Sequence, residues 1–122
     1  RSLSDLMPPP DPAVAEPGLR LAGHDLNPAN LIRMEVDGDL IRIITTEGTR
    51  IAQGPLTPLV ESLPAGIGIM VHRADWVARS AVVGTTRIGR SRALRLRNGD
   101  VVRVASSRDA VVAEWLRQNG LV

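Results

Sequence analysis

The sequence contains no cysteine, lysine, tyrosine or phenylalanine, and these absences exclude much catalytic chemistry. Without cysteine there is no thiol nucleophile, no disulfide and no thiolate metal ligand. No HExxH motif or lysine-containing phosphate loop occurs, and Gly66-Ile67-Gly68 lacks the third glycine of a dinucleotide fingerprint. The carboxylates of Asp37-Gly38-Asp39 lack the remaining ligands of a calcium loop. We therefore expect a protein that is not an enzyme, with no metal site and no cofactor.

Long hydrophobic runs are also missing. No stretch approaches the roughly 20 apolar residues of a membrane-spanning helix, and the N-terminus lacks the order of a signal peptide. Together with the absence of cysteine, this favours a cytoplasmic location. Because the chain begins at Arg1 rather than methionine, we expect an upstream regulatory or membrane domain outside this sequence. A membrane domain there would tether the chain to the inner membrane.

Composition divides the chain into two regions. Residues 1–18 hold five of the nine prolines and show no apolar period, which is typical of an extended linker. Residues 19–122 are long enough for one domain with its own core. We therefore expect a Pro-rich linker over 1–18, followed by a single domain over 19–122.

Alternating apolar and polar residues predict β-strands over much of this domain. Residues 31–37 and 40–46 flank Gly38-Asp39 and predict a β-hairpin, with further strands near 49–51, 67–72, 76–77 and 81–84. Residues 84–91 are polar and arginine-rich, and we expect them to form a turn. Trp76 is expected in the core.

Two segments have helical spacing. Pro55 suits the first turn of a helix whose buried side chains are Leu56, Leu59, Val60 and Leu63. A final helix ends near Asn119 and Gly120, with Ser106 or Ser107 as its N-cap. Its predicted buried residues are Val111, Val112, Trp115 and Leu116. The pattern as a whole predicts a mostly β fold with two short helices.

The positions of the apolar residues in the last hairpin indicate whether its loop has an even or an odd number of residues. A two-residue Asn98-Gly99 loop would place Leu94 opposite Arg103, whereas an odd loop with Gly99 in the left-handed conformation keeps the apolar residues together. We therefore predict a three-residue loop. The apolar face then contains Leu94, Leu96, Val102 and Val104, and the exposed face contains Arg95, Arg97 and Arg103.

Charge is strongly segregated along the chain. Between residues 72 and 108 nine arginines face only Asp75 and Asp100, a balance of +7, whereas residues 1–71 carry −4 and the tail from Asp109 carries −1. Arginine offers a planar fork of donors that suits phosphate and the edge of guanine. Because Trp76 and Trp115 are the only aromatic residues available for base stacking, double-stranded DNA is favoured over single strands and RNA.

The order of the motifs resembles the LytTR (LytR/AgrA-type) DNA-binding domain family of bacterial response regulators. The resemblance spans residues from about 19 to 117. It comprises the hairpin IRMEVDGDLIRI, the helix LTPLVESLP, the segment IMVHRADWVARSAVV, the hairpin ALRLRNGDVVRV and the final ASSRDAVVAEWL. Its most specific piece is Val71-His72-Arg73 followed by Trp76-Val77, which is similar to the family's VHRS-x-hydrophobic-V-N.

The resemblance implies an elongated antiparallel β-sheet domain whose loops enter successive major grooves, usually bending the duplex and often reading paired direct repeats. It implies base contacts by Arg73, by Arg108 near the start of the last helix, and by Asp39 in the first hairpin turn. Assigning Arg108 assumes one or two extra residues before that helix, because an ungapped match falls on Ala105-Ser106. Phosphate or supporting contacts are expected from His72, Arg79, Arg87, Arg90, Arg92 and Ser107.

Departures from the family pattern keep a second hypothesis open. Ala74 replaces the motif serine, and Ala78 stands where asparagine is common. Asp39 is also an ordinary turn residue, and His72 is also a candidate for a structural imidazole. The alternative is a β-rich protein-interaction module that binds an acidic partner through the Arg face of the 93–104 hairpin.

Overall fold

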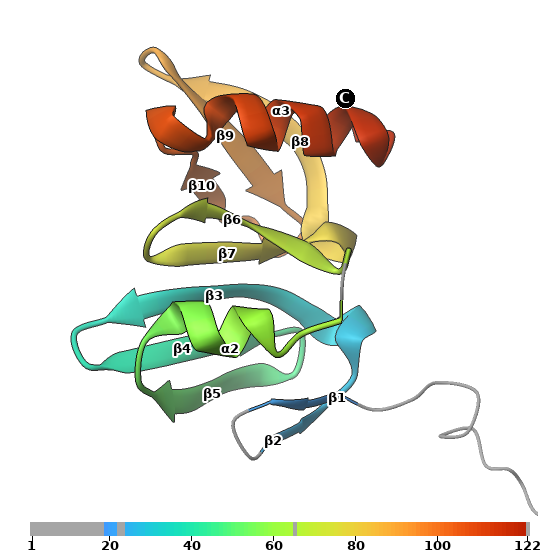
Figure 1. Ribbon diagram of the computed structural model, residues 1–122. Coiled ribbons are helices and arrows are strands. Elements are labelled where there is room, and N and C mark those ends of the chain that lie inside the picture. The colour runs from blue at the N-terminus through green and yellow to red at the C-terminus, as the bar shows by residue number, and fades with distance from the viewer. Residues whose placement is uncertain (1–18, 22–23, 65, 122) are drawn as a thin grey trace, which may run out of the picture.

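The computed structural model describes residues 19–21, 24–64 and 66–121, so the predicted linker 1–18 lies outside the described residues. The described part is mostly β, and its strands form three antiparallel sheets that follow one another along the long direction of the molecule (Figure 1). A small sheet of β1 (Leu19–Leu21) and β2 (His24–Leu26) lies at one end. The predicted fold class is confirmed.

The central sheet has five strands in the order β5-β4-β3-β7-β6. A short 3-10 helix, η1 (Pro28–Asn30), leads into β3 (Leu31–Asp37), which pairs with β4 (Leu40–Thr45) across the predicted Gly38-Asp39 turn. Gly38 has a φ of 65°, which a side-chain-bearing residue rarely adopts. The remaining strands are β5 (Gly48–Gln53), β6 (Gly68–His72) and β7 (Asp75–Ala78).

The first helix, α2 (Leu56–Glu61), covers one face of this sheet (Figure 1). Leu56 is buried, and the other predicted apolar positions, Leu59, Val60 and Leu63, are partly buried against the core. Pro55 precedes the helix as its N-cap, one position earlier than predicted. The helical spacing therefore identified the correct buried stripe.

The upper sheet contains β8 (Val82–Ile88), β9 (Ser91–Leu96) and β10 (Val101–Arg103). The prediction of a turn over residues 84–91 was wrong, because β8 runs to Ile88 and only Gly89-Arg90 form the turn. Ala81, expected at the start of a strand, ends the 3-10 helix η2 (Arg79–Ala81). The polar Thr85 and Thr86 are β-branched and suit a strand without alternating hydrophobicity.

The predicted odd loop between β9 and β10 is confirmed. The amide of Leu96 donates to the carbonyl of Asp100 at 2.8 Å, so the three residues 97–99 form the loop, and Gly99 has a φ of 97°. Leu94 pairs with Val102, and the four predicted apolar residues are buried. Arg97 therefore lies in the loop and not on the exposed strand face where it was predicted.

The end of the chain departs from prediction in its capping. A 3-10 helix, η3 (Ser106–Arg108), separates the serines from α3 (Asp109–Gln118), and Arg108 occupies the N-cap position without a side-chain cap bond. Neither serine therefore caps α3. Val112 and Leu116 are fully buried as predicted, whereas Val111 is 49% exposed and Trp115 is only partly buried.

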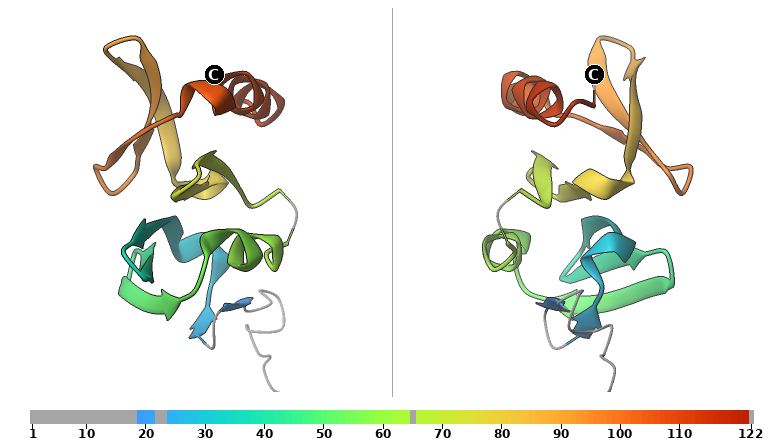
Figure 2. Two further views of the ribbon diagram at one scale, coloured as in Figure 1. Left: turned by 60° about the vertical axis from the view of Figure 1, so that its left-hand side comes forward. Right: turned by 90° about the vertical axis from the view of Figure 1, so that its right-hand side faces the viewer.

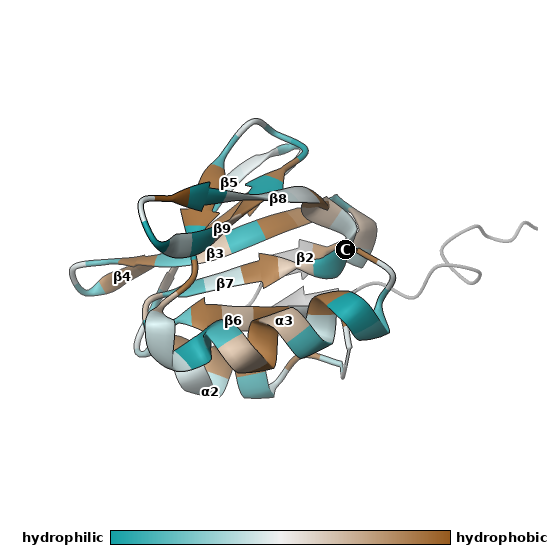
Figure 3. Cartoon of the chain, turned by 90° about the horizontal axis from the view of Figure 1, so that it is seen from above, coloured by the Kyte–Doolittle hydropathy of each residue, from teal (hydrophilic) through white to brown (hydrophobic). Residues whose placement is uncertain are grey.

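One hydrophobic core runs through the central and upper sheets. Helices α2 and α3 lie on the same side of the molecule, and apolar residues follow the strands beside them (Figures 2 and 3). Trp76 of β7 is 1% exposed, as predicted, and its ring lies over Gly68 of the neighbouring strand. A methyl group at Gly68 would lie 2.1 Å from Cζ2 of Trp76, so only glycine fits there.

Gly68→Ala is therefore expected to destabilise the domain by about 1–3 kcal/mol, because the added methyl overpacks a buried ring and also meets the Val77 carbonyl at 2.4 Å. The measurement is urea unfolding followed by tryptophan fluorescence. Gly84→Ala is the matched control in β8. There the new methyl meets only the movable end of the Arg95 side chain, and the expected cost is below about 1 kcal/mol. Equal costs for the two variants would contradict this packing argument.

Candidate nucleic-acid interface

Three segments predicted to contact bases lie on one side of the molecule. The β3–β4 turn, the β6–β7 turn and the N-terminal end of α3 all lie at the left of Figure 1. They carry Asp39, Arg73 and Arg108, in that order. We call this side the loop edge. Positions far apart in the sequence are therefore brought to one surface.

The β6–β7 turn presents Arg73 to solvent. Arg73 is exposed and has no hydrogen-bond or ion-pair partner among residues 19–21, 24–64 and 66–121. The turn is held from within, because the amide of Ala74 donates to Nδ1 of His72 at 3.2 Å. His72 is 43% exposed, so it combines a structural role with an accessible ring. Arg73 is thus the free cation of a fixed turn.

Arg108 is attached to the same hairpin. Its side chain is half-buried, and its Nε donates to the carbonyl of Met70 at 3.0 Å. Next to it, the amide of Ala105 donates to the carbonyl of Val71 at 2.9 Å. These two bonds fix η3 against β6. The Nε of Arg108 is occupied by this contact, so its two terminal amino groups remain for a ligand.

The other predicted phosphate contacts near the loop edge differ in how free their side chains are. Arg87 and Arg90 are exposed at the β8–β9 turn, and Ser107 is exposed in η3. Arg92 is 21% exposed and forms an ion pair with Asp109, with 2.9 Å between Nε and Oδ1. Its charge is therefore largely neutralised.

Arg79 lies away from the loop edge. Its amide donates to the carbonyl of Ile67, at the end of the β6–β7 hairpin opposite the turn that holds Arg73. Although Arg79 is exposed, the structure does not bring it together with the other predicted contacts.

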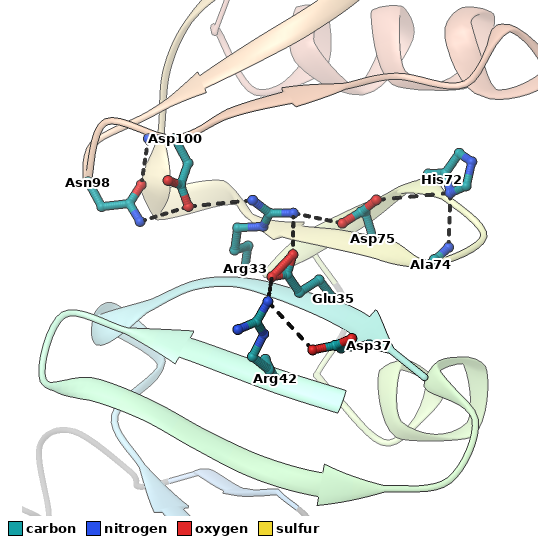
Figure 4. A network of polar contacts seen from close by, with 9 residues as sticks. All are labelled: Arg33, Glu35, Asp37, Arg42, His72, Ala74, Asp75, Asn98 and Asp100. Carbon is teal, nitrogen blue, oxygen red and sulfur yellow. Dashed lines mark hydrogen bonds and ion pairs between the residues drawn. The ribbon is translucent and has the colours of Figure 1, made fainter. Parts of the chain in front are cut away.

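Arg33 was not predicted from the sequence, and it lies at the centre of a network of ion pairs (Figure 4). Its side chain is 14% exposed and contacts carboxylates of Asp75 at 2.7 Å, Glu35 at 3.2 Å and Asp100 at 3.4 Å. Arg42 extends the network from β4, with Nη2 at 3.2 Å from Glu35. The predicted hairpin register could have indicated the pairing of Glu35 with Arg42, but the contact with Asp100 depends on tertiary structure.

This network engages both acids of the basic segment. Asp75 and Asp100 are the only acids between residues 72 and 108, and both are paired with Arg33, which lies outside that segment. Among the described residues, Arg92 is the only one of the nine arginines there that has a carboxylate partner. The other eight guanidinium groups are available to attract an anion.

Two features, a membrane-spanning helix and a metal-binding cluster, are absent from the part of the chain that the structure describes. It contains no helix long and apolar enough to cross a membrane. It also contains no cluster of histidine and carboxylate side chains suited to a metal ion.

Comparisons with known proteins identify the fold. The sequence matches no protein-family model and no curated protein. A solved structure that is similar is the LytTr DNA-binding domain of a protein described as a methyl-accepting/DNA response regulator from Bacillus cereus. The match covers 76% of this chain and 86% of that one, with 18% sequence identity and a TM-score of 0.70. The chain therefore has the fold of a LytTR-type domain, as the order of its motifs predicted.

Arg33→Gln is expected to destabilise the domain by about 1–3 kcal/mol, because it leaves three half-buried carboxylates without their shared cation. Chemical denaturation gives the value directly. Arg117→Gln is the matched control, since it removes a 71% exposed partner of Glu114 and should cost less than about 0.5 kcal/mol. If the two substitutions cost the same, Arg33 is not the structural centre described above.

Proposed function

We propose that this chain is the double-stranded DNA-binding output domain of a bacterial transcription regulator. The observation that carries the proposal is Arg73, an exposed and unpaired arginine in a fixed turn on the loop edge. The surrounding segment has a balance of +7, and both of its acids are ion-paired with Arg33. The LytTR-type fold supports the same function.

The chemistry of base reading follows from the side chains at the loop edge. The guanidinium of Arg73 can donate two parallel hydrogen bonds to O6 and N7 of guanine in the major groove. The terminal amino groups of Arg108 are suited to the same acceptors, while the carboxylate of Asp39 accepts from the amino group of cytosine. In this proposal the loops of the loop edge enter successive major grooves, and the duplex bends to reach them.

Two further elements belong to the proposal. Paired direct repeats in the DNA would bind two copies of the domain side by side. An upstream regulatory or membrane domain would supply the signal that controls binding. Both are suggested by the likeness to LytTR domains. Both can be tested by binding measurements once the preferred DNA sequence is known.

The experiment that tests the function is selection from a random duplex library at near-physiological salt, with the unaltered chain, Arg73→Ala and Arg108→Ala. We expect enrichment of a short motif, repeated where two copies bind. Because Arg108 also holds Met70, its variant needs a parallel measurement of stability. Recovery of no motif at all would contradict sequence-specific binding.

Arg73→Ala is expected to weaken binding to the selected site by about 1–3 kcal/mol and to relax the preference at one base pair, because the fork of donors to guanine is lost. Affinities for the site and for each single-base variant measure this. Arg79→Ala is the control, since it removes an exposed arginine from the opposite end of the same hairpin. A uniform loss across all sequences would make Arg73 a phosphate contact instead.

A protein-interaction role is favoured by one surface of the upper sheet. Arg95, Val101 and Arg103 are exposed on the β9–β10 hairpin, where Val101 is 46% exposed and pairs with Arg95. This mixture of apolar and cationic groups suits an acidic partner. The library selection separates the two functions, because an interaction module retains duplexes only through salt-sensitive contacts without a preferred sequence.

A further inference from the structure

The geometry points to a pocket at the loop edge that takes one phosphate of the DNA backbone and whose affinity is limited by Asp109. The pocket is a cleft of about 270 Å³ between the β8–β9 turn and η3. Its polar lining consists of Arg87, Arg90, Ser91, Arg92, Ser106 and Asp109, with the buried Val104 beneath them. This inference rests on the proposed function, because it assigns one backbone contact of the same interface.

The charges in this pocket do not balance. Three guanidinium groups face a single carboxylate, that of Asp109, and this carboxylate is engaged with Arg92. Arg87 and Arg90 are exposed and have no acidic partner among the described residues. Like charges held this close repel each other unless an anion lies between them. The pocket therefore favours a bound anion.

The turn is already arranged for such a ligand. Nη1 of Arg87 donates to the carbonyl of Arg90 at 3.3 Å, so the side chain of Arg87 lies along the turn instead of extending freely. The hydroxyl groups of Ser91 and Ser106 add donors from the two walls of the pocket. Arginine and serine are common partners of phosphate oxygens in protein–DNA interfaces, where such contacts orient the protein.

The location selects a DNA phosphate over other anions. Ser106 follows Ala105, whose amide is bonded to Val71, and Val71 directly precedes the His72-Arg73 turn. The β8–β9 turn and the N-terminal end of α3 lie on the same side as the β6–β7 turn (Figure 1). A duplex whose bases contact Arg73 therefore carries its backbone past the pocket.

Asp109 acts against this contact. Its carboxylate is 44% exposed, lies 2.9 Å from Nε of Arg92, and borders the pocket. It neutralises one guanidinium and repels an entering phosphate. Removing its negative charge while keeping its shape, as in Asp109→Asn, would free Arg92 to contact the phosphate. Asp109 thus sets the affinity below the value that the arginines alone would give.

The first test measures affinity for the selected duplex as a function of salt concentration. In the double variant Arg87→Ala/Arg90→Ala, the slope of log affinity against log salt should fall by about one. Binding near 0.1 M salt should weaken by about tenfold, because one phosphate contact is lost. Base preference should not change. The control is Arg79→Ala/Arg117→Ala, which removes the same total charge from positions outside the loop edge.

The second test changes the charge in the opposite direction. Asp109→Asn should tighten binding by about three- to tenfold, as expected for one added phosphate contact. Glu114→Gln in the same helix changes the net charge equally but lies outside the pocket, and should leave affinity within about twofold. A thermal melt of each variant checks that α3 remains folded, and an Asp109→Asn variant that melts early is replaced by Asp109→Ser.

Several results would overturn the inference. If the two double variants have equal salt slopes of DNA binding, the pocket holds no backbone phosphate. The same conclusion follows if Asp109→Asn binds the duplex no more tightly than Glu114→Gln. A titration of inorganic phosphate into the domain without DNA distinguishes a free anion from a DNA phosphate. If phosphate binds in the pocket, and Arg87→Ala/Arg90→Ala leaves the salt slope of DNA binding unaltered, the cleft is a site for a free anion. If the unaltered chain binds no duplex, the proposed function fails and the pocket with it, whereas a specific complex with unaffected pocket variants contradicts the pocket alone.

Discussion

The ion pairs of Arg33 are the constraint on which the rest of this surface depends. One nearly buried guanidinium joins β3 to β7 through Asp75 and to the β9–β10 turn through Asp100. It therefore fixes the upper sheet relative to the central one. It also pairs with both acids of the basic segment. Without Arg33, the negative charges of Asp75 and Asp100 would have no cationic partner across the sheets and would weaken the field that attracts an anion.

The loop edge exists because backbone contacts bring distant segments together. The carbonyl groups of Met70 and Val71 accept from Arg108 and Ala105, so the start of α3 is held against the strand that leads to Arg73. Two turns and one helix end then share a surface (Figure 1). The strands therefore direct these loops to one side of the molecule.

Local patterns predicted the fold where one rule governed the outcome. The alternation of Leu94 and Val102 required an odd loop, and the structure has one. The prediction failed at Thr85, where a polar strand lacks alternating hydrophobicity, and at Ser106, where a 3-10 turn separates the serine from α3. Arg33 could not be recognised, because its partner Asp100 lies 67 residues away.

The sequence by itself determined the mostly β architecture and the segregated charge, since periodicity, turn residues and composition are local properties. Only the tertiary structure decided which arginines are free. It pairs Arg92 with Asp109, places Arg79 away from the loop edge, and pairs Arg33 with Asp75. The physical reason is that charge pairing depends on distances of a few ångströms between side chains, which the fold sets and the order of residues does not.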